Sequence, residues 1–136
     1  MFKRLLIAAA LLGAAAAFIV RTDDDVEIDY GTSSIYSKAD MHAAVAAIRK
    51  EFRTFKGCEL HSIRYAGDAC MTAENLKWMN SLGNNGPYAW CIEFKSDFRS
   101  PKQPSGAWEP DTEYKDWEWW LARTEDGEWE VLTYGY

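Results

Sequence analysis

The chain has 136 residues, of which 48% are hydrophobic and 26% are charged, and its formal net charge is −6 at pH 7. This length and composition are typical of one globular domain and exclude an intrinsically disordered chain. The excess of acidic residues argues against nucleic acid as the main partner and against docking on an anionic membrane surface.

The first 21 residues predict a signal that directs export and then anchors the chain. Lys3 and Arg4 precede an apolar run over residues 5–20, and a positive end before such a run stays in the cytoplasm. We expect a single-pass protein of the cell membrane with its C-terminal domain outside the cytoplasm. The alternative is a secreted protein, because the alanines at 14–17 fit a cleavage site. We favour the anchor because residues 18–20 extend the apolar run.

An acidic linker is predicted over residues 22–34, before an extracytoplasmic domain over residues 35–136. This stretch is short of large apolar residues, carries the acidic run Asp23-Asp24-Asp25, and ends with Gly31-Thr32-Ser33-Ser34. Such a composition is typical of a segment that holds a domain away from the membrane.

The first helix is predicted to begin at Ser37, because Ser37 and Asp40 resemble a capping box. Apolar residues then recur at helical spacing and predict one buried stripe. The residues of this stripe are Met41, Ala44, Val45, Ile48, Phe52 and Phe55. Gly57 is a natural residue to end the helix.

The middle of the chain predicts two strands and a second helix. Cys58–Tyr65 and Tyr88–Lys95 alternate as strands do, and a helix capped by Thr72 is expected over Thr72–Leu82. Ser96–Glu113 is then predicted to be a long loop. Loops of this length inside a compact domain tend to be functional.

The C-terminal segment Tyr114–Tyr136 predicts a β-hairpin around the turn Asp126-Gly127. A two-residue turn places Trp119 opposite Tyr134, whereas a longer loop with a bulge places it opposite Thr133. Simple alternation puts side chains on two faces of the second strand. Trp129 and Val131 are expected on one face, and Leu132 and Tyr134 on the other.

The predicted element order is therefore α-β-α-β-β-β after the hydrophobic N-terminal segment. We predict an α+β fold in which a curved antiparallel sheet of about four strands packs on the N-terminal helix. Helices cover one face of this sheet.

Few residues in the sequence suggest a catalytic or metal-binding site. Cys58, Cys70 and Cys91 are odd in number, so one pair could bridge outside the cell, and the sequence does not select which pair. Their spacing does not fit a zinc site, and the sequence contains no G-x-S-x-G, H-E-x-x-H or phosphate-binding loop motif. We predict no catalytic residue, no metal and no cofactor.

Several aromatic motifs occur near the C-terminus: Ser96-Asp97-Phe98, Gly106-Ala107-Trp108-Glu109-Pro110, Tyr114-x-x-Trp117-x-Trp119 and Trp129-x-Val131. They resemble the ending of a group of small bacterial proteins of unknown function, mainly Gram-positive and with an N-terminal hydrophobic segment. The ending also resembles the terminal hairpin of nuclear-transport-factor-2-like (cystatin-like) domains. The resemblance covers roughly residues 34–136 and implies a curved sheet around a helix, with room for a conical pocket. That superfold includes isomerases and dehydratases, but their catalytic positions match no residue here.

We predict a membrane-tethered binding or accessory module whose partner is a small ligand or an envelope protein. The alternative is a small pocket enzyme of the isomerase or lyase type. A deep pocket with a desolvated carboxylate beside a tyrosine hydroxyl would favour the enzyme, and a core filled by tryptophans would favour the module. The candidate binding residues lie in the loop and the hairpin: Asp97, Trp108, Tyr114, Trp117 and Arg123.

Two of these candidates also have predicted structural roles. Trp108 is expected to anchor the long loop over one end of the sheet, because burial of its indole can offset the entropy of ordering the loop. Asp97 is expected to lie under the loop, where it accepts backbone N–H groups or pairs with Arg99 or Arg123.

Overall fold

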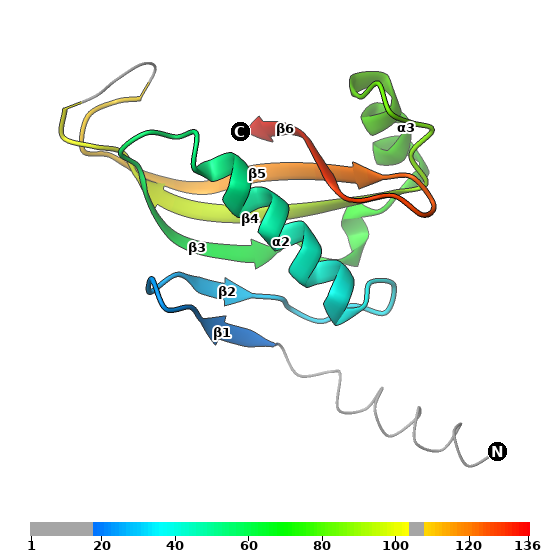
Figure 1. Ribbon diagram of the computed structural model, residues 1–136, viewed down its shortest axis with the longest axis horizontal. Coiled ribbons are helices and arrows are strands. Elements are labelled where there is room, and N and C mark those ends of the chain that lie inside the picture. Colours follow the sequence, from blue (N-terminus) through cyan, green and yellow to red (C-terminus); the bar gives the residue numbers. More distant parts are fainter. Residues whose placement is uncertain (1–17, 104–107) are drawn as a thin grey trace, which may run out of the picture.

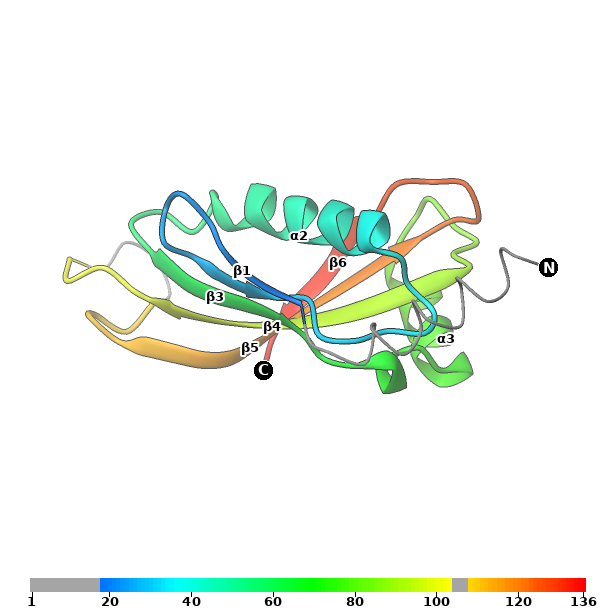
Figure 2. The same ribbon diagram turned by 90° about the horizontal axis from the view of Figure 1, so that it is seen from below.

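The computed structural model describes residues 18–103 and 108–136, which form a six-stranded sheet with helices on both faces. Helix α2 (Lys38–Phe52) lies across one face. A 3₁₀ turn, η1 (Asp68–Cys70), and helix α3 (Ala73–Leu82) lie at one end of the other face (Figures 1 and 2). The strands follow each other across the sheet: β1 (Ile19–Arg21), β2 (Glu27–Asp29), β3 (Glu59–Tyr65), β4 (Trp90–Arg99), β5 (Glu113–Arg123) and β6 (Glu130–Gly135).

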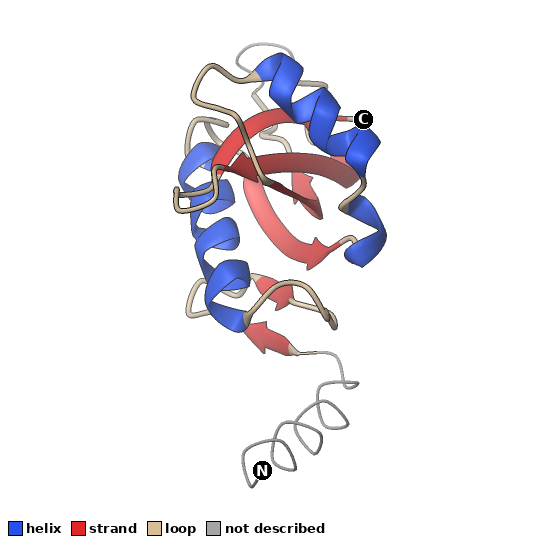
Figure 3. Cartoon of the chain, turned by 90° about the vertical axis from the view of Figure 1, so that its right-hand side faces the viewer, coloured by secondary structure: helices blue, strands red, loops and turns tan. Residues whose placement is uncertain are grey.

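The predicted order and the predicted count of about four antiparallel strands are wrong. The expectation that helices cover only one face is also wrong, because α3 lies on the face opposite α2 (Figure 2). Two strands precede the first helix, and β2 pairs parallel with β3, with Ile28 opposite Ile63. The sheet is therefore mixed, because α2 forms the crossover between two parallel neighbours. Its curvature between the two helices is visible in Figure 3.

Strand β2 occupies part of the segment expected to be a linker. Val26, Ile28 and Tyr30 are buried, and the acidic residues Glu27 and Asp29 alternate with them. This period-two pattern is the signal of a half-buried strand. The acidic residues point away from α2. Because they make the segment acidic overall, its composition suggested a linker and not a strand.

Helix α2 begins and packs as predicted. The side chain of Ser37 accepts the backbone N–H of Asp40, and the side chain of Asp40 accepts the backbone N–H of Ser37. This capping box satisfies two N–H groups that have no partner inside the helix. All members of the predicted stripe are buried: Met41, Ala44, Val45, Ile48, Phe52 and Phe55.

The core lies between α2 and the sheet and is filled by aromatic and branched side chains. Phe94, Phe98 and Trp119 have no exposed surface. Cross-strand pairing places Phe94 opposite Trp119, so two of the largest fully buried side chains meet on the α2 face.

The β5–β6 hairpin combines features of both expected registers. Trp119 lies opposite Tyr134, as a short turn predicts, but Leu121 lies opposite Val131, so a bulge interrupts the ladder. The extra residue returns Tyr134 to the α2 face, where its ring is 5.1 Å from Trp119. The expectation that Tyr134 lies on the face opposite Trp129 and Val131 is therefore wrong.

The remaining elements differ from expectation mainly at their ends. Thr72 caps α3 as predicted, but β4 continues to Arg99, so the predicted loop Ser96–Glu113 shortens to residues 100–112. None of the three cysteines is in a disulfide. No helix of the described part is long and apolar enough to cross a membrane. Most of the predicted anchor, residues 1–17, lies outside that part.

Candidate functional site

A groove lies on the described surface between α2 and the loop that joins β5 to β6. Its volume is about 480 Å³. Helix α2 contributes Asp40, Ala43, Ala46, Ala47 and Lys50, and the hairpin contributes Arg123, Gly127, Glu128 and Trp129. We name this feature the α2 groove.

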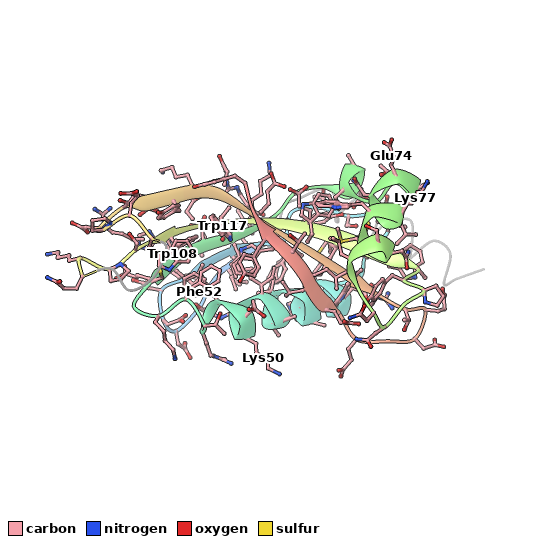
Figure 4. The ribbon with its side chains drawn as sticks, turned by 90° about the horizontal axis from the view of Figure 1, so that it is seen from above. Lys50, Phe52, Glu74, Lys77, Trp108 and Trp117 are labelled. Carbon is pink, nitrogen blue, oxygen red and sulfur yellow. The ribbon has the colours of Figure 1, made fainter. Side chains whose placement is uncertain are left out.

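The groove exists because one stripe of α2 carries small side chains. Ala43, Ala46 and Ala47 recur at helical spacing between Asp40 and Lys50, and each covers the backbone with a single methyl group. The buried stripe faces the sheet, so this second stripe is free to face solvent. Figure 4 shows Lys50 projecting outward near the C-terminal end of the helix.

Arg123 lies at the other end of the groove and is held from three sides. Its Nη2 is 3.5 Å from Asp40 Oδ1, its Nη1 donates to the carbonyl of Glu125, and its guanidinium lies 5.0 Å from the Trp129 ring centre. Trp129 in turn donates its indole N–H to the Asp40 carbonyl over 3.1 Å. Arg123 Nε is buried without a hydrogen-bond partner among the described residues. The cation is thus oriented, but its hydrogen-bonding capacity is only partly used.

The candidates Trp108, Tyr114 and Trp117 do come together, at the opposite end of the sheet from Arg123. The ring centres of Trp108 and Trp117 are 5.5 Å apart, and each ring lies within 5.4 Å of the buried Phe98 (Figure 4). Tyr114 stacks on Phe98 at 5.1 Å. Because Trp108 is half-buried in this cluster, the prediction that it anchors the loop is confirmed.

Asp97 faces the other side of the sheet and has a structural role. It accepts the backbone N–H of Asp116 over 3.0 Å and pairs with Arg64 at 3.3 Å. Asp116 has a positive φ of 59°, and the β4–β5 register shifts at this point, so Asp97 stabilises a bulge. The expected backbone contact is confirmed, but the expected partners Arg99 and Arg123 are wrong, because Arg99 pairs with Asp111.

The cysteines do not form a reactive centre. Burial raises the pKa of the Cys91 thiol to about 11 and also raises the pKa of Cys70. Thiols with raised pKa values carry little thiolate at neutral pH and are poor nucleophiles. No cluster in the described part of the chain has the three acidic, histidine or cysteine ligands that a metal ion would need.

Sequence reasoning identified Arg123 but missed the rest of the groove. The missed signal is the run of alanines at 43, 46 and 47, flanked by a charged residue at each end. On a helix surface this spacing leaves a shallow channel. The second wall of the groove comes from the loop between β5 and β6. The alanine spacing on the helix does not show that this loop lies nearby.

Comparison of the chain with protein families, with curated proteins and with solved structures gives no significant match in any of the three. The resemblance to nuclear-transport-factor-2-like domains therefore stays a prediction.

Proposed function

We propose that this domain is a binding module that holds a short extended segment of a partner protein in the α2 groove. The observation that carries the proposal is the groove itself, with alanine walls and an oriented cation at one end. From Asp40 to Lys50 the helix rises about 15 Å. An extended chain covers that length with four to five residues.

The polar residues at the ends of the groove favour a segment that carries a carboxylate. Arg123 lies near the first turn of α2 and Lys50 near its last, so one cation stands at each end. Lys50 forms no ion pair within the described part of the chain. An acidic side chain or a C-terminal carboxylate can pair with Lys50 or with the Arg123 guanidinium, while small apolar side chains fit against the alanines.

The filled core supports a binding module over a pocket enzyme. An enzyme of the isomerase type needs a desolvated carboxylate inside a pocket, beside a hydroxyl donor. In the described residues the space between α2 and the sheet is occupied by rings such as Phe94 and Trp119, which have no exposed surface. The α2 groove is open to solvent, and a module that only binds needs no closed site.

The proposal includes export and a membrane tether, as the N-terminal sequence predicts. Phe18 already belongs to the fold, because its N–H donates to the Gly31 carbonyl over 3.3 Å and its ring stacks on Tyr30. A tether that ends at residue 17 keeps the domain close to the membrane. The partner is then an envelope protein or a peptide near the membrane surface.

Selection of peptides from a random library on the full chain, followed by calorimetry, tests the proposal. Ala46→Trp fills the groove and should weaken binding of the selected peptide at least tenfold. Ala73→Trp is the control, because Ala73 is exposed at the start of α3, on the other face of the sheet from the groove, and it should leave the affinity unchanged. A peptide that binds both variants equally well would place the site elsewhere.

A further inference from the structure

A second hollow lies near the opposite face of the sheet, between α3 and the end of β6. Its volume is about 100 Å³, and it shares no residue with the α2 groove. Helix α3 contributes Trp78, β5 contributes Glu118 and Trp120, and residues 133–136 complete the lining. We name it the Trp78 hollow.

Two indoles form a corner in this hollow. The ring centres of Trp78 and Trp120 are 5.2 Å apart and the rings are inclined at 68°. Trp120 is only 7% exposed, whereas Trp78 is 41% exposed. A large indole left open to solvent beside a hollow is typical of a surface that meets a ligand or a partner.

A carboxylate is fixed beside this corner. The indole N–H of Trp120 donates to Glu118 Oε1 over 3.1 Å, so the acidic group is oriented by the same ring that lines the hollow. Neither Glu118 nor its neighbour Glu93 forms an ion pair with a basic side chain within the described part of the chain. Glu118 is the one charged side chain among the residues that line the hollow, so the lining has an excess of negative charge.

The neighbouring carboxyl group adds to this excess. Glu93 lies opposite Trp120 and Glu118 lies opposite Lys95, so the two glutamates are diagonal neighbours on one face. Burial, followed by the charge of Glu118, raises the pKa of Glu93 to about 7, and Lys95 offsets this shift only in part. A positive group near Glu118 would relieve the repulsion between the two carboxylates.

From this geometry we propose that the Trp78 hollow binds an organic cation, an ammonium or guanidinium group that packs on the indoles and pairs with Glu118. Aromatic faces attract such cations, and tryptophan does so best among the side chains. The volume suits a head group and is well below the 300–1,000 Å³ of sites for larger ligands. An anion would be repelled, and a neutral apolar group would desolvate Glu118 without compensation.

Nuclear magnetic resonance of the full chain in a maltoside detergent tests the proposal, with choline as the probe. The indole N–H signals of Trp78 and Trp120 should shift as choline is added. The neutral isostere 3,3-dimethylbutanol should produce at least fivefold weaker binding, since it has the same shape without the charge. A second titration uses N-acetylarginine amide, which carries the guanidinium of an arginine side chain. If it binds more tightly than choline, the natural ligand is an arginine side chain, and if choline binds more tightly, the ligand is a free ammonium compound.

Two variants and one control locate the site. Glu118→Gln and Trp78→Leu should each weaken choline binding about tenfold while the far-ultraviolet circular dichroism stays unchanged. Glu74→Gln removes the same charge from α3, where Glu74 projects into solvent (Figure 4) and is not among the residues that line the hollow, and it should change the affinity less than twofold. Equal binding of dimethylbutanol, an equal loss in Glu74→Gln, or unshifted indole signals would overturn the proposal. None of these outcomes bears on the α2 groove.

Discussion

Glu93 is the carboxyl group that the fold perturbs most clearly. Burial raises its pKa to about 7 from the ordinary 4.5, and the charge of Glu118 adds to the shift. The charged groups that act on it are Glu118 on β5 and Lys95 on its own strand, and its backbone N–H donates to the thiol of Cys70 in η1. Between pH 4.5 and 7 the folded chain holds a proton that the unfolded chain has released, so stability falls as pH rises.

Glu93→Gln should remove this pH dependence. The variant cannot ionise, so its free energy of unfolding should exceed that of the natural chain by about 2 kcal/mol at pH 8, a value lowered for solvent screening because Glu93 is partly exposed, and the difference should be much smaller at pH 5. Chemical denaturation at the two pH values measures the difference. Glu74→Gln is the control, since Glu74 is exposed, and it should leave the slope unchanged. An unchanged slope in Glu93→Gln would mean that Glu93 is ionised and solvated in the fold.

Trp129 supports both the core and the groove. It is 8% exposed, its ring is 5.7 Å from Tyr36, and its indole N–H donates to α2. Trp129→Ala should therefore lower the free energy of unfolding by about 3–5 kcal/mol, the usual range for a buried large aromatic. Denaturant titration measures the loss. Trp78→Ala, which truncates an exposed indole, should cost less than about 1 kcal/mol, and similar losses in the two variants would contradict this assignment.

At the scale of elements, helices were predictable because their signals are local. The capping box at Ser37, the apolar stripe of α2 and the Thr72 cap lie within a few residues of each other, and all of them occur in the structure. Strands β1 and β2 were missed because three residues each are too short for composition to mark them. The bulge beside Leu132 depends on packing across the sheet, so the faces of β6 could not be assigned from alternation alone.

The candidate site was less predictable than the fold, because it too depends on contacts between distant parts of the chain. Trp108, Tyr114 and Trp117 were named as candidates from the sequence, but their mutual contact was not predicted. They are close in the chain, and their rings lie within 6.0 Å of each other in the structure. Arg123 meets Asp40 across 83 residues of sequence, and no spacing rule links the two. A groove between a helix and a distant loop is a property of tertiary contacts.

The described ends of the connection between β4 and β5, residues 100–103 and 108–112, should become less protected when Trp108 is removed. Trp108 is half-buried and lies 5.0 Å from the Phe55 ring and 5.4 Å from Tyr114. Trp108→Ala should cost about 2 kcal/mol, less than Trp129→Ala because less of the indole is buried. Hydrogen exchange should show faster exchange of the Ser100 amide, which bonds to the Thr112 carbonyl. Trp108→Phe should retain most of the protection, and unchanged exchange in Trp108→Ala would mean that the prolines and Ser100 hold the connection alone.

At the scale of the whole molecule, the sheet begins inside the segment predicted to be the anchor. Strand β1 starts at Ile19, and Phe18 packs against Tyr30 and lies beneath the Lys38 ammonium at 4.0 Å. Residues 18–20 therefore cannot lie in the membrane while the domain is folded as described. Residues 18–20, which favoured an anchor over a cleaved signal, are therefore part of the fold. The alanines at 14–17 adjoin the first residue of the fold, so cleavage there would release the domain intact.

We still expect the full chain to stay in the membrane, because the apolar run continues to the fold and Lys3 and Arg4 can extend toward the interface. Fractionation of cells followed by intact mass analysis measures the outcome, and the membrane fraction should contain the chain with its N-terminus uncleaved. Leu11→Lys places a charge in the middle of the run at a cost of about 2.5–3.5 kcal/mol and should reduce membrane retention. Ile35→Lys is the matched control, because Ile35 is exposed on the folded domain. A soluble product that begins near Ala17 or Phe18 would contradict the anchor and would identify the secreted form.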